Sequence, residues 1–307
     1  MSGEPTARHS LSNYAIFVAL AVECLVLGLA TDSFFTAANL ANVIRQNAFT
    51  AILAAGMTFV ILIAGIDLSV GSVVGLTGVL CADVLAHGFG IAPAVGAALA
   101  VGVAVGLLNG LVTTHARIPS FVVTLATMLA VRGAAYKYTD ARTITGLPPS
   151  FELLSSGVAS ALIMTAVFVV SWIVLVRTPF GRHVYAVGGN RDAAWLSGVR
   201  VQRLELAVYT ICGLTAGLAG VLVASRLSAG YPRAGEYYEL DAIAAVVVGG
   251  TSLFGGRGSI WGTLAGAFFI GILNNGLNLY RVSPYDQMIV KGAVLLAAAS
   301  LDRWRTT

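Results

Sequence analysis

The sequence predicts an all-α, polytopic membrane protein with about ten transmembrane helices, some of them short or broken, and a further short helix in one polar loop. Of the 307 residues, 57% are hydrophobic and only 10% are charged, and the mean hydropathy is +0.86. Soluble domains carry about a quarter of charged residues, so a soluble core could not absorb this chain. Short segments of alternating polarity are absent, which argues against a β-barrel.

Ten apolar runs follow one another along the chain, each near the length of about 20 residues that a bilayer requires. The fifth and the eighth are the shortest, and we expect either to be broken or re-entrant. The first run follows a polar N-terminus without a cleavage signature, so we expect it to be retained. We treat residues 1–307 as one membrane domain. The ten runs span residues 14–31, 48–64, 70–86, 91–114, 121–136, 159–176, 204–225, 242–254, 259–279 and 285–301.

The basic residues predict the orientation. An even number of spans places both termini on one side, and that side collects most of the arginines, including five between Arg177 and Arg203. Loops rich in Lys and Arg stay in the cytoplasm. We therefore expect both termini, together with Arg8, Arg117, Arg257, Arg303 and Arg305, on the cytoplasmic side. The opposite side has Arg45, Lys137, Arg142, Arg226, Arg233 and Arg281.

Residues 177–203 form the one long polar segment between apolar runs. The glycines at 188 and 189 are expected to break the chain, and Asn190 is expected to cap a short helix. An acidic residue and alanines favour its first turn, and a glycine ends it. A solvated loop with positive-inside charges is the alternative. The helix and its flanks comprise Gly189, Asn190, Asp192, Ala193, Ala194 and Gly198.

Several polar side chains lie within or beside the apolar runs, where an ionisable group is costly and often functional. For Asp67 we favour an N-cap of the next helix, and the same argument applies to Asp241. Arg132 and Lys291 either reach an interface or face the bundle interior, and the sequence does not separate these. The asparagines suit either a polar solute or interhelical hydrogen bonds. The candidates for the substrate path are Asp67, Asn109, Arg132, Asn274, Asn275 and Asn278.

Glycines recur every four residues in three of the spans, a spacing that lets helix backbones approach closely in lipid. Tight packing is the interpretation we favour over a sliding or hinge surface. The repeats are Gly102, Gly106 and Gly110; Gly213 and Gly217; and Gly262 and Gly266.

The sequence offers no catalytic or metal-binding motif. Cys24, Cys81 and Cys212 lie singly in apolar runs, and the four histidines are scattered. No Gly-x-x-x-x-Gly-Lys-[Ser/Thr] motif is present, so the chain is not expected to bind ATP through a P-loop. The basic residues sit between spans, where membrane insertion explains them, so nucleic acid is not an expected partner. We expect a protein that is not an enzyme and holds no cofactor or metal.

Long motifs in order along the chain carry a family resemblance. They are Gly-Ile-Asp-Leu-Ser-Val-Gly-Ser at 65–72, Gly-Leu-Leu-Asn-Gly at 106–110, Arg-Ile-Pro-Ser-Phe-Val-Val-Thr-Leu at 117–125, Phe-Gly-Arg at 180–182, Ala-Val-Gly-Gly-Asn at 186–190, Glu-Leu-Asp-Ala-Ile-Ala-Ala at 239–245, Gly-Gly-Thr-Ser-Leu-Phe-Gly-Gly-Arg-Gly-Ser-Ile-Trp-Gly at 249–262 and Asn-Asn-Gly-Leu-Asn at 274–278. With these motifs the sequence resembles, over nearly its whole length, the permease subunit of ribose-type ABC importers. It departs in Ala64, where the family usually has glycine, and in Asp192, where glutamate is commoner.

The resemblance implies a bacterial inner-membrane subunit that works as two copies by alternating access. A cytoplasmic ABC ATPase would bind ATP and grip the coupling loop, about residues 177–203, and a sugar-binding protein would deliver ribose or a similar sugar from outside. The motifs do not specify which sugar. The alternative is an ion-coupled secondary transporter, which needs an acidic residue deep in the bilayer, and Glu23 is the candidate.

Overall fold

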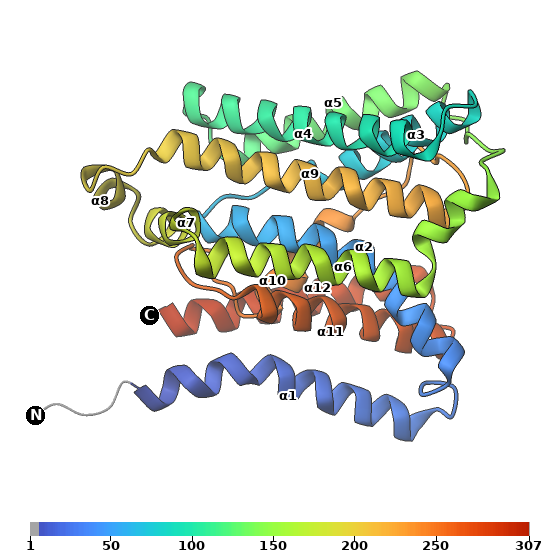
Figure 1. The fold of residues 1–307 in the computed structure, drawn as a ribbon. Helices are drawn as coiled ribbons and strands as arrows, with labels where there is room; N and C mark the ends of the chain where they lie inside the picture. Colours follow the sequence, from blue (N-terminus) through green and yellow to red (C-terminus); the bar gives the residue numbers. More distant parts are fainter. Residues whose placement is uncertain (1–5, 307) are drawn as a thin grey trace, which may run out of the picture.

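The computed structural model describes the backbone of residues 6–306 and the side chains of residues 15–300, and nearly all of it is helical (Figure 1). The predicted all-α class is confirmed. Residues 1–5 and 307, and the side chains of Arg8, Arg303 and Arg305, lie outside this description. The long helices are α1 (Thr6–Ala30), α2 (Ala37–Leu62), α3 (Val70–Ala86), α4 (Ile91–Ala116), α5 (Ser120–Thr139), α6 (Gly157–Trp172), α9 (Val201–Leu227), α11 (Ile260–Leu279) and α12 (Pro284–Thr306).

Three α-helices are short, and two further segments have 3-10 or π-helical geometry. The short helices are α7 (Pro179–Gly189), α8 (Arg191–Leu196) and α10 (Tyr238–Val248). The 3-10 segment η1 (Pro149–Ser155) precedes α6, and the π-helical segment η2 (Ile173–Arg177) continues it. Among the described residues, five helices are long and apolar enough to cross a membrane: α2, α4, α6 with η2, α9 and α11.

The structure differs from the prediction at the start of the second span and in the fifth span, for which a break was considered. The second helix begins at Ala37 rather than near residue 48, because the Thr36 side chain caps it and the helix continues through a polar stretch that lowers the local hydropathy. The fifth span is a continuous helix of 20 residues rather than a broken one. The eighth is short, as predicted: α10 has 11 residues and is followed by non-helical chain up to Ser259.

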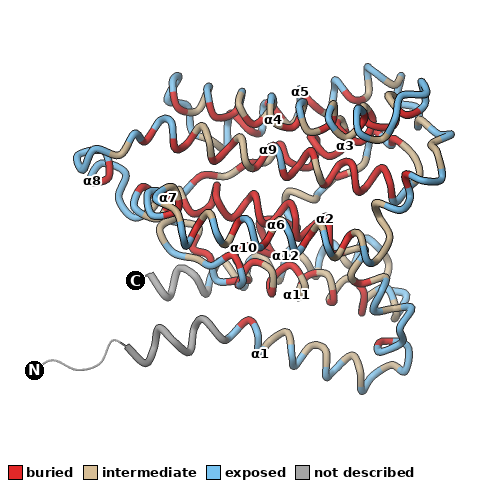
Figure 2. Tube along the Cα trace, in the orientation of Figure 1, coloured by how far each residue is buried: buried red, intermediate tan, exposed pale blue. Residues whose placement is uncertain are grey.

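Helices α2 and α9 form the centre of the molecule. Helix α9 packs against α2, α3 and α4, while α2 also contacts α6, α10 and α11. Every residue from 47 to 62 of α2 is buried, as expected of a helix surrounded on all sides (Figure 2). Helix α1 lies at the edge and packs against α11.

Two of the three predicted glycine repeats lie where α4 crosses α9, and the third, Gly262 and Gly266 of α11, lies against α10. A Cβ atom on Gly102 would collide with the carbonyl oxygen of Gly213, and one on Gly106 would collide with that of Tyr209. The same holds in reverse for Gly213, whose Cβ would strike Gly102. The backbones therefore touch directly, which confirms the tight-packing interpretation.

The two ends of the bundle differ. One end carries α7, α8 and the turn between α4 and α5, together with the start of α1 and the end of α12, and we name it the α8 end (left in Figure 1). The opposite end carries η1 and the loop of residues 228–237.

Candidate functional site

The polar segment 177–203 folds as two short helices rather than one. Thr178 caps α7 by accepting a hydrogen bond from the Gly181 amide. The predicted cap of α8 is confirmed, because the Asn190 side chain accepts a hydrogen bond from the Ala193 amide at 2.9 Å. Gly198 follows the helix with φ +86°, the left-handed conformation of a glycine that ends a helix.

The expected chain break at the glycine pair was wrong. Gly188 and Gly189 are the last residues of α7, and the break falls at Asn190, whose backbone is extended. Gly188 is required for another reason: a Cβ there would collide with the carbonyl oxygen of Leu62, at the end of α2. The glycine lets α7 lie directly on the central helix.

Helix α8 presents an unusual surface to solvent. Ala194 is its one buried residue, whereas Asp192 and Ala193 are exposed. Two large apolar side chains are also exposed, Trp195 at 67% and Leu196 at 77%. We did not include either in the predicted site, although their position directly after the alanines of a polar loop is a usable signal. Exposed large apolar groups that cluster often mark an interaction surface.

A bidentate ion pair ties α8 to α9. The Arg191 Nε donates to Glu205 Oε1 at 2.8 Å, and Nη2 donates to Oε2 at 3.3 Å. Glu205 is buried, at 8% exposure, so its charge depends on this partner. The hydrogen bonds to the Glu205 carboxylate raise the pKa of Arg191 above its ordinary value. Two parallel bonds also fix the orientation of the guanidinium.

Asp67 lies in the chain between α2 and α3 and is only 1% exposed. The interpretation of this residue as an N-cap was wrong. Its Oδ1 accepts hydrogen bonds from the Ser69 amide and hydroxyl at 2.9 and 2.6 Å, and Ser69, which directly precedes α3, makes no capping bond. Asn109 of α4 donates to the Ser69 hydroxyl at 2.9 Å. The three side chains form a buried polar link between α4 and the start of α3.

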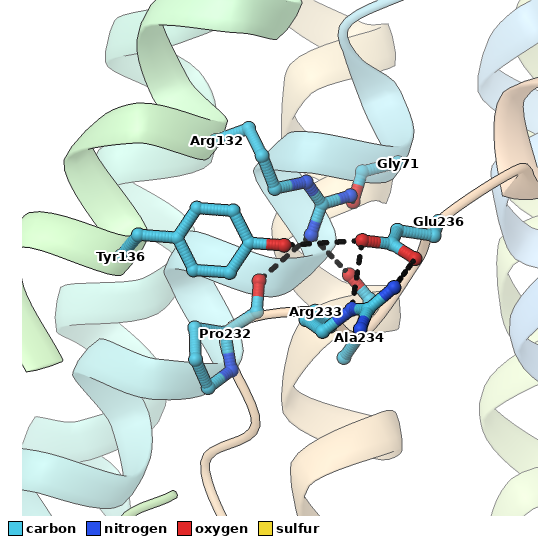
Figure 3. Close-up of polar contacts among 7 residues, drawn as sticks. All are labelled: Gly71, Arg132, Tyr136, Pro232, Arg233, Ala234 and Glu236. Atoms are coloured by element: carbon cyan, nitrogen blue, oxygen red, sulfur yellow. Dashed lines mark hydrogen bonds and ion pairs between the residues drawn. The ribbon is translucent and has the colours of Figure 1, made fainter. Parts of the chain in front are cut away.

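Arg132 binds backbone carbonyls instead of a carboxylate (Figure 3). Its Nη1 donates to Pro232 and Ala234 at 2.8 and 2.7 Å, and its Nη2 donates to Gly71 at 3.1 Å. It therefore holds the 228–237 loop against α3 and α5. The two alternatives raised by the sequence, an interface and the interior, did not include this arrangement.

Glu236 joins the same group. It accepts a hydrogen bond from the Tyr136 hydroxyl and pairs with Arg233 at 3.1 Å. The Arg233 guanidinium holds the pKa of Glu236 below its ordinary value. The loop is thus fixed at two points on α5, Arg132 and Tyr136.

Of the two alternatives for Lys291, an interface or the bundle interior, the structure shows the second, and there the side chain meets a carboxylate. Its Nζ lies 3.0 Å from both oxygens of Asp241. Asp241 is in the first turn of α10, so the capping interpretation was wrong here as well. The pair joins α10 to α12.

The asparagines of α11 bond mainly to other helices. Asn275 and Asn39 of α2 exchange two amide hydrogen bonds, at 3.0 and 2.8 Å. Asn278 accepts one from Gln287 of α12 at 2.9 Å. The Asn274 oxygen is buried without a partner among the described residues, as are both carboxylate oxygens of Glu23.

The six candidates for a substrate path therefore do not form one site. Asp67 and Asn109 lie together beside Ser69 at the start of α3, Arg132 of α5 bonds the first turn of α3 at Gly71 and the 228–237 loop, and the asparagines 274, 275 and 278 lie along α11. Within the described residues, no three His, Cys, Asp or Glu side chains are placed to hold a metal ion.

Comparison with known proteins identifies the family. A family model described as the branched-chain amino acid transport system / permease component matches residues 39–299. The chain belongs to this permease family. The permease is 45% identical over 320 residues to the ribose import permease protein RbsC of Haemophilus influenzae, with 100% of this chain and 99% of that protein aligned.

Other relatives agree with this assignment. The permease is 45% identical over 294 residues to the Bacillus subtilis protein of the same name, covering 94% of this chain and 91% of the relative. It is 37% identical over 300 residues to the D-allose transport system permease protein AlsC of Escherichia coli, covering 94% and 91%. No solved structure matches the chain. As a permease component, the family lacks an ATPase domain, and ATP is used by a partner subunit.

Proposed function

We propose that the chain is the membrane-spanning permease of an ABC importer for ribose or a related monosaccharide. The observation that carries this proposal is the match to ribose import permeases along the full chain at 45% identity. Relatives named for D-allose and xylose are 37% and 36% identical, so a pentose or hexose of related shape is the solute class. The chain itself performs no covalent chemistry.

Helix α8 is the proposed binding site for the ATPase. Its exposed residues Ala193, Trp195 and Leu196 form a ridge, which we propose fits a groove on the ATPase. Arg191 then carries the motion of the ridge to α9 through Glu205. We accordingly propose that the α8 end, with both termini, faces the cytoplasm of a bacterial cell.

The importer works as two copies of this chain around a shared path, with a sugar-binding protein docking at the opposite end. Closure of the ATPases moves the two α8 helices, and the cavity between the copies alternates its opening. Five of the six polar residues predicted for the path make side-chain hydrogen bonds within this chain, and the Asn274 oxygen has no partner among the described residues. We therefore propose that Asp67, Asn109 and Arg132 hold the helices that shape the path.

ATP-driven uptake tests the function. The permease is reconstituted with its ATPase and binding protein in liposomes, and entry of radiolabelled ribose is measured with ATP inside or outside and with a proton uncoupler. Uptake should require ATP on the α8 side, survive the uncoupler, and be reduced by excess unlabelled allose or xylose if these are shared substrates. Uptake abolished by the uncoupler at constant ATP would favour an ion-coupled transporter. Glu23, whose carboxylate oxygens are buried without a partner among the described residues, would then be its candidate ion site.

A further inference from the structure

A large cavity opens at the α8 end, and the Arg191–Glu205 ion pair described above forms part of its wall. Its volume is about 1060 Å³, and it lies between the end of α2, the turn joining α4 to α5, helix α8 and the start of α9. Ligand sites commonly have volumes of roughly 300–1,000 Å³, so the cavity has room for a small molecule.

The cavity has a surplus of unpaired positive charge. Arg117, Arg200 and Arg203 line it, and none of their guanidinium groups has a hydrogen-bond or ion-pair partner among the described residues. Arg191 also lines it but is neutralised by Glu205. The remaining carboxylate in the wall is Asp192. Three free guanidinium groups therefore face one free carboxylate.

The arginines come from two separate parts of the chain. Arg117 ends α4 in a left-handed conformation with φ +56°, and Arg200 and Arg203 flank the start of α9. Positive-inside insertion explains arginines at this end of the bundle, but it does not require them to converge on one hollow. A planar guanidinium matches the oxygens of a phosphate group in two parallel hydrogen bonds.

Neutral polar groups also line the cavity. Ser120, Gln202 and Tyr209 supply hydroxyl and amide groups. Such groups suit the hydroxyls of a ligand whose phosphate stays at the arginines.

We propose that this cavity binds a phosphate-bearing ligand, either a small phosphorylated metabolite or a phospholipid headgroup, with the phosphate on Arg117, Arg200 and Arg203. Arg191, Asp192 and Trp195 of α8 form one side of the cavity. An occupied cavity therefore contacts the joint between α8 and α9, and binding is expected to alter the rate at which ATP hydrolysis drives transport. The proposal does not depend on which solute is imported.

Binding is measured first on the purified permease in phosphatidylcholine nanodiscs. Inorganic phosphate and ribose 5-phosphate are titrated by calorimetry, and the emission of Trp195 is followed in a variant whose other three tryptophans are replaced by Phe. We expect saturable binding that weakens with salt. Binding should be roughly tenfold or more weaker in the double variant Arg200→Gln/Arg203→Gln. The matched control is Arg182→Gln, an exposed arginine of α7 that does not line the cavity.

A second arm separates the two sources of phosphate. Nanodiscs with phosphatidylglycerol should block the soluble probes if the headgroup is the ligand, and leave them unchanged if a metabolite is. The proposal is overturned if neither probe binds and phosphatidylglycerol leaves Trp195 emission unchanged. It is also overturned if the double variant binds as the parent does. A third result would also contradict the proposal. If adding the ATPase abolishes binding of the phosphate probes, and the double variant no longer retains the ATPase, the arginines form a docking surface for that protein.

Discussion

At the scale of single residues, backbone carbonyl groups bind the guanidinium of Arg132, for which the sequence suggested no partner. Arg132 has no carboxylate bonded to it, and it donates three hydrogen bonds to carbonyl groups of Gly71, Pro232 and Ala234. A pattern of side chains does not predict which backbone oxygens will accept a hydrogen bond. Two of the three acceptors here lie about one hundred residues after Arg132 in the sequence. The sequence therefore indicated a polar environment but not its source.

Replacing Arg132 tests this role. Arg132→Leu removes three charge-assisted bonds and frees the 228–237 loop, and we expect a loss of about 1–3 kcal/mol in stability, since bonds within membrane proteins average roughly 0.6 kcal/mol and reach about 1.7. Ribose uptake should fall with it. Arg132→Lys keeps the charge but lacks the planar guanidinium, so its stability and uptake should lie between those of the parent protein and Arg132→Leu. Thermal unfolding in detergent measures the change.

The control for Arg132 is Lys137→Leu on the same helix, which removes an exposed cation that makes no hydrogen bond among the described residues. Its melting temperature should stay at that of the parent protein. If Arg132→Leu melts at that temperature too, the three carbonyl contacts do not hold the loop.

The Asp241–Lys291 pair makes a different prediction. Both side chains are largely buried, at 14% and 29% exposure, so removal of one partner leaves an uncompensated charge. Lys291→Met alone should lower stability by about 2 kcal/mol or more, whereas the double change Asp241→Asn/Lys291→Met should recover much of that loss. Unfolding of the single and double variants forms a double-mutant cycle. Strictly additive losses would mean that the pair does not couple α10 to α12.

At the scale of helices, the features that depend on neighbouring residues were predicted correctly, and those that depend on contacts between distant segments were not. The cap at Asn190 and the terminal glycine at Gly198 depend on a few neighbouring residues, and both were predicted. Helix α7 was missed because its glycine pair suggests a break. Gly188 is there to let α7 touch the end of α2, a contact between distant segments. The start of α2 was misplaced for a similar reason, since polar residues that bond to other helices lower the hydropathy.

The link between α8 and α9 predicts a defect in coupling rather than in folding. Glu205→Gln weakens the ion pair while keeping the side-chain shape, and we expect ATP hydrolysis by the assembled importer to continue while uptake per ATP falls several-fold. The charge-swapped double variant Arg191→Glu/Glu205→Arg should restore part of the uptake. Both rates are measured in the same proteoliposomes. A swap that transports no better than either single change would argue against transmission through this pair.

The α4–α9 contact predicts strong sensitivity to size at one glycine and none at another. Gly106→Leu places a side chain against the Tyr209 carbonyl and should force the helices apart, with little protein recovered from the membrane. Gly96→Leu, on the same helix, meets nothing within 4 Å and should be tolerated. Yield and monodispersity after extraction measure the difference. Equal yields from the two variants would contradict direct backbone contact.

At the scale of the whole molecule, composition and hydropathy fixed the class and the order of spans, because lipid demands helices whose backbone bonds are internal. The arrangement of polar groups could not be obtained in this way. Asn39 and Asn275 exchange amide hydrogen bonds across 236 positions of sequence, and the cavity at the α8 end combines arginines from two separate parts of the chain. Such pairings depend on which helices become neighbours.

The orientation of the whole bundle gives the last prediction. In a protein freed of Cys24, Cys81 and Cys212, single cysteines are placed at Ser197 beside α8 and at Tyr231 in the opposite loop, both exposed. A membrane-impermeant maleimide should label position 231 in intact spheroplasts, and position 197 only in inverted vesicles, because the arginine-rich α8 end is expected in the cytoplasm. Cysteine at Leu162, exposed on α6 within a candidate span, should react in neither until detergent is added. Labelling of position 197 from outside would reverse the orientation and, with it, the proposed contact between α8 and a cytoplasmic ATPase.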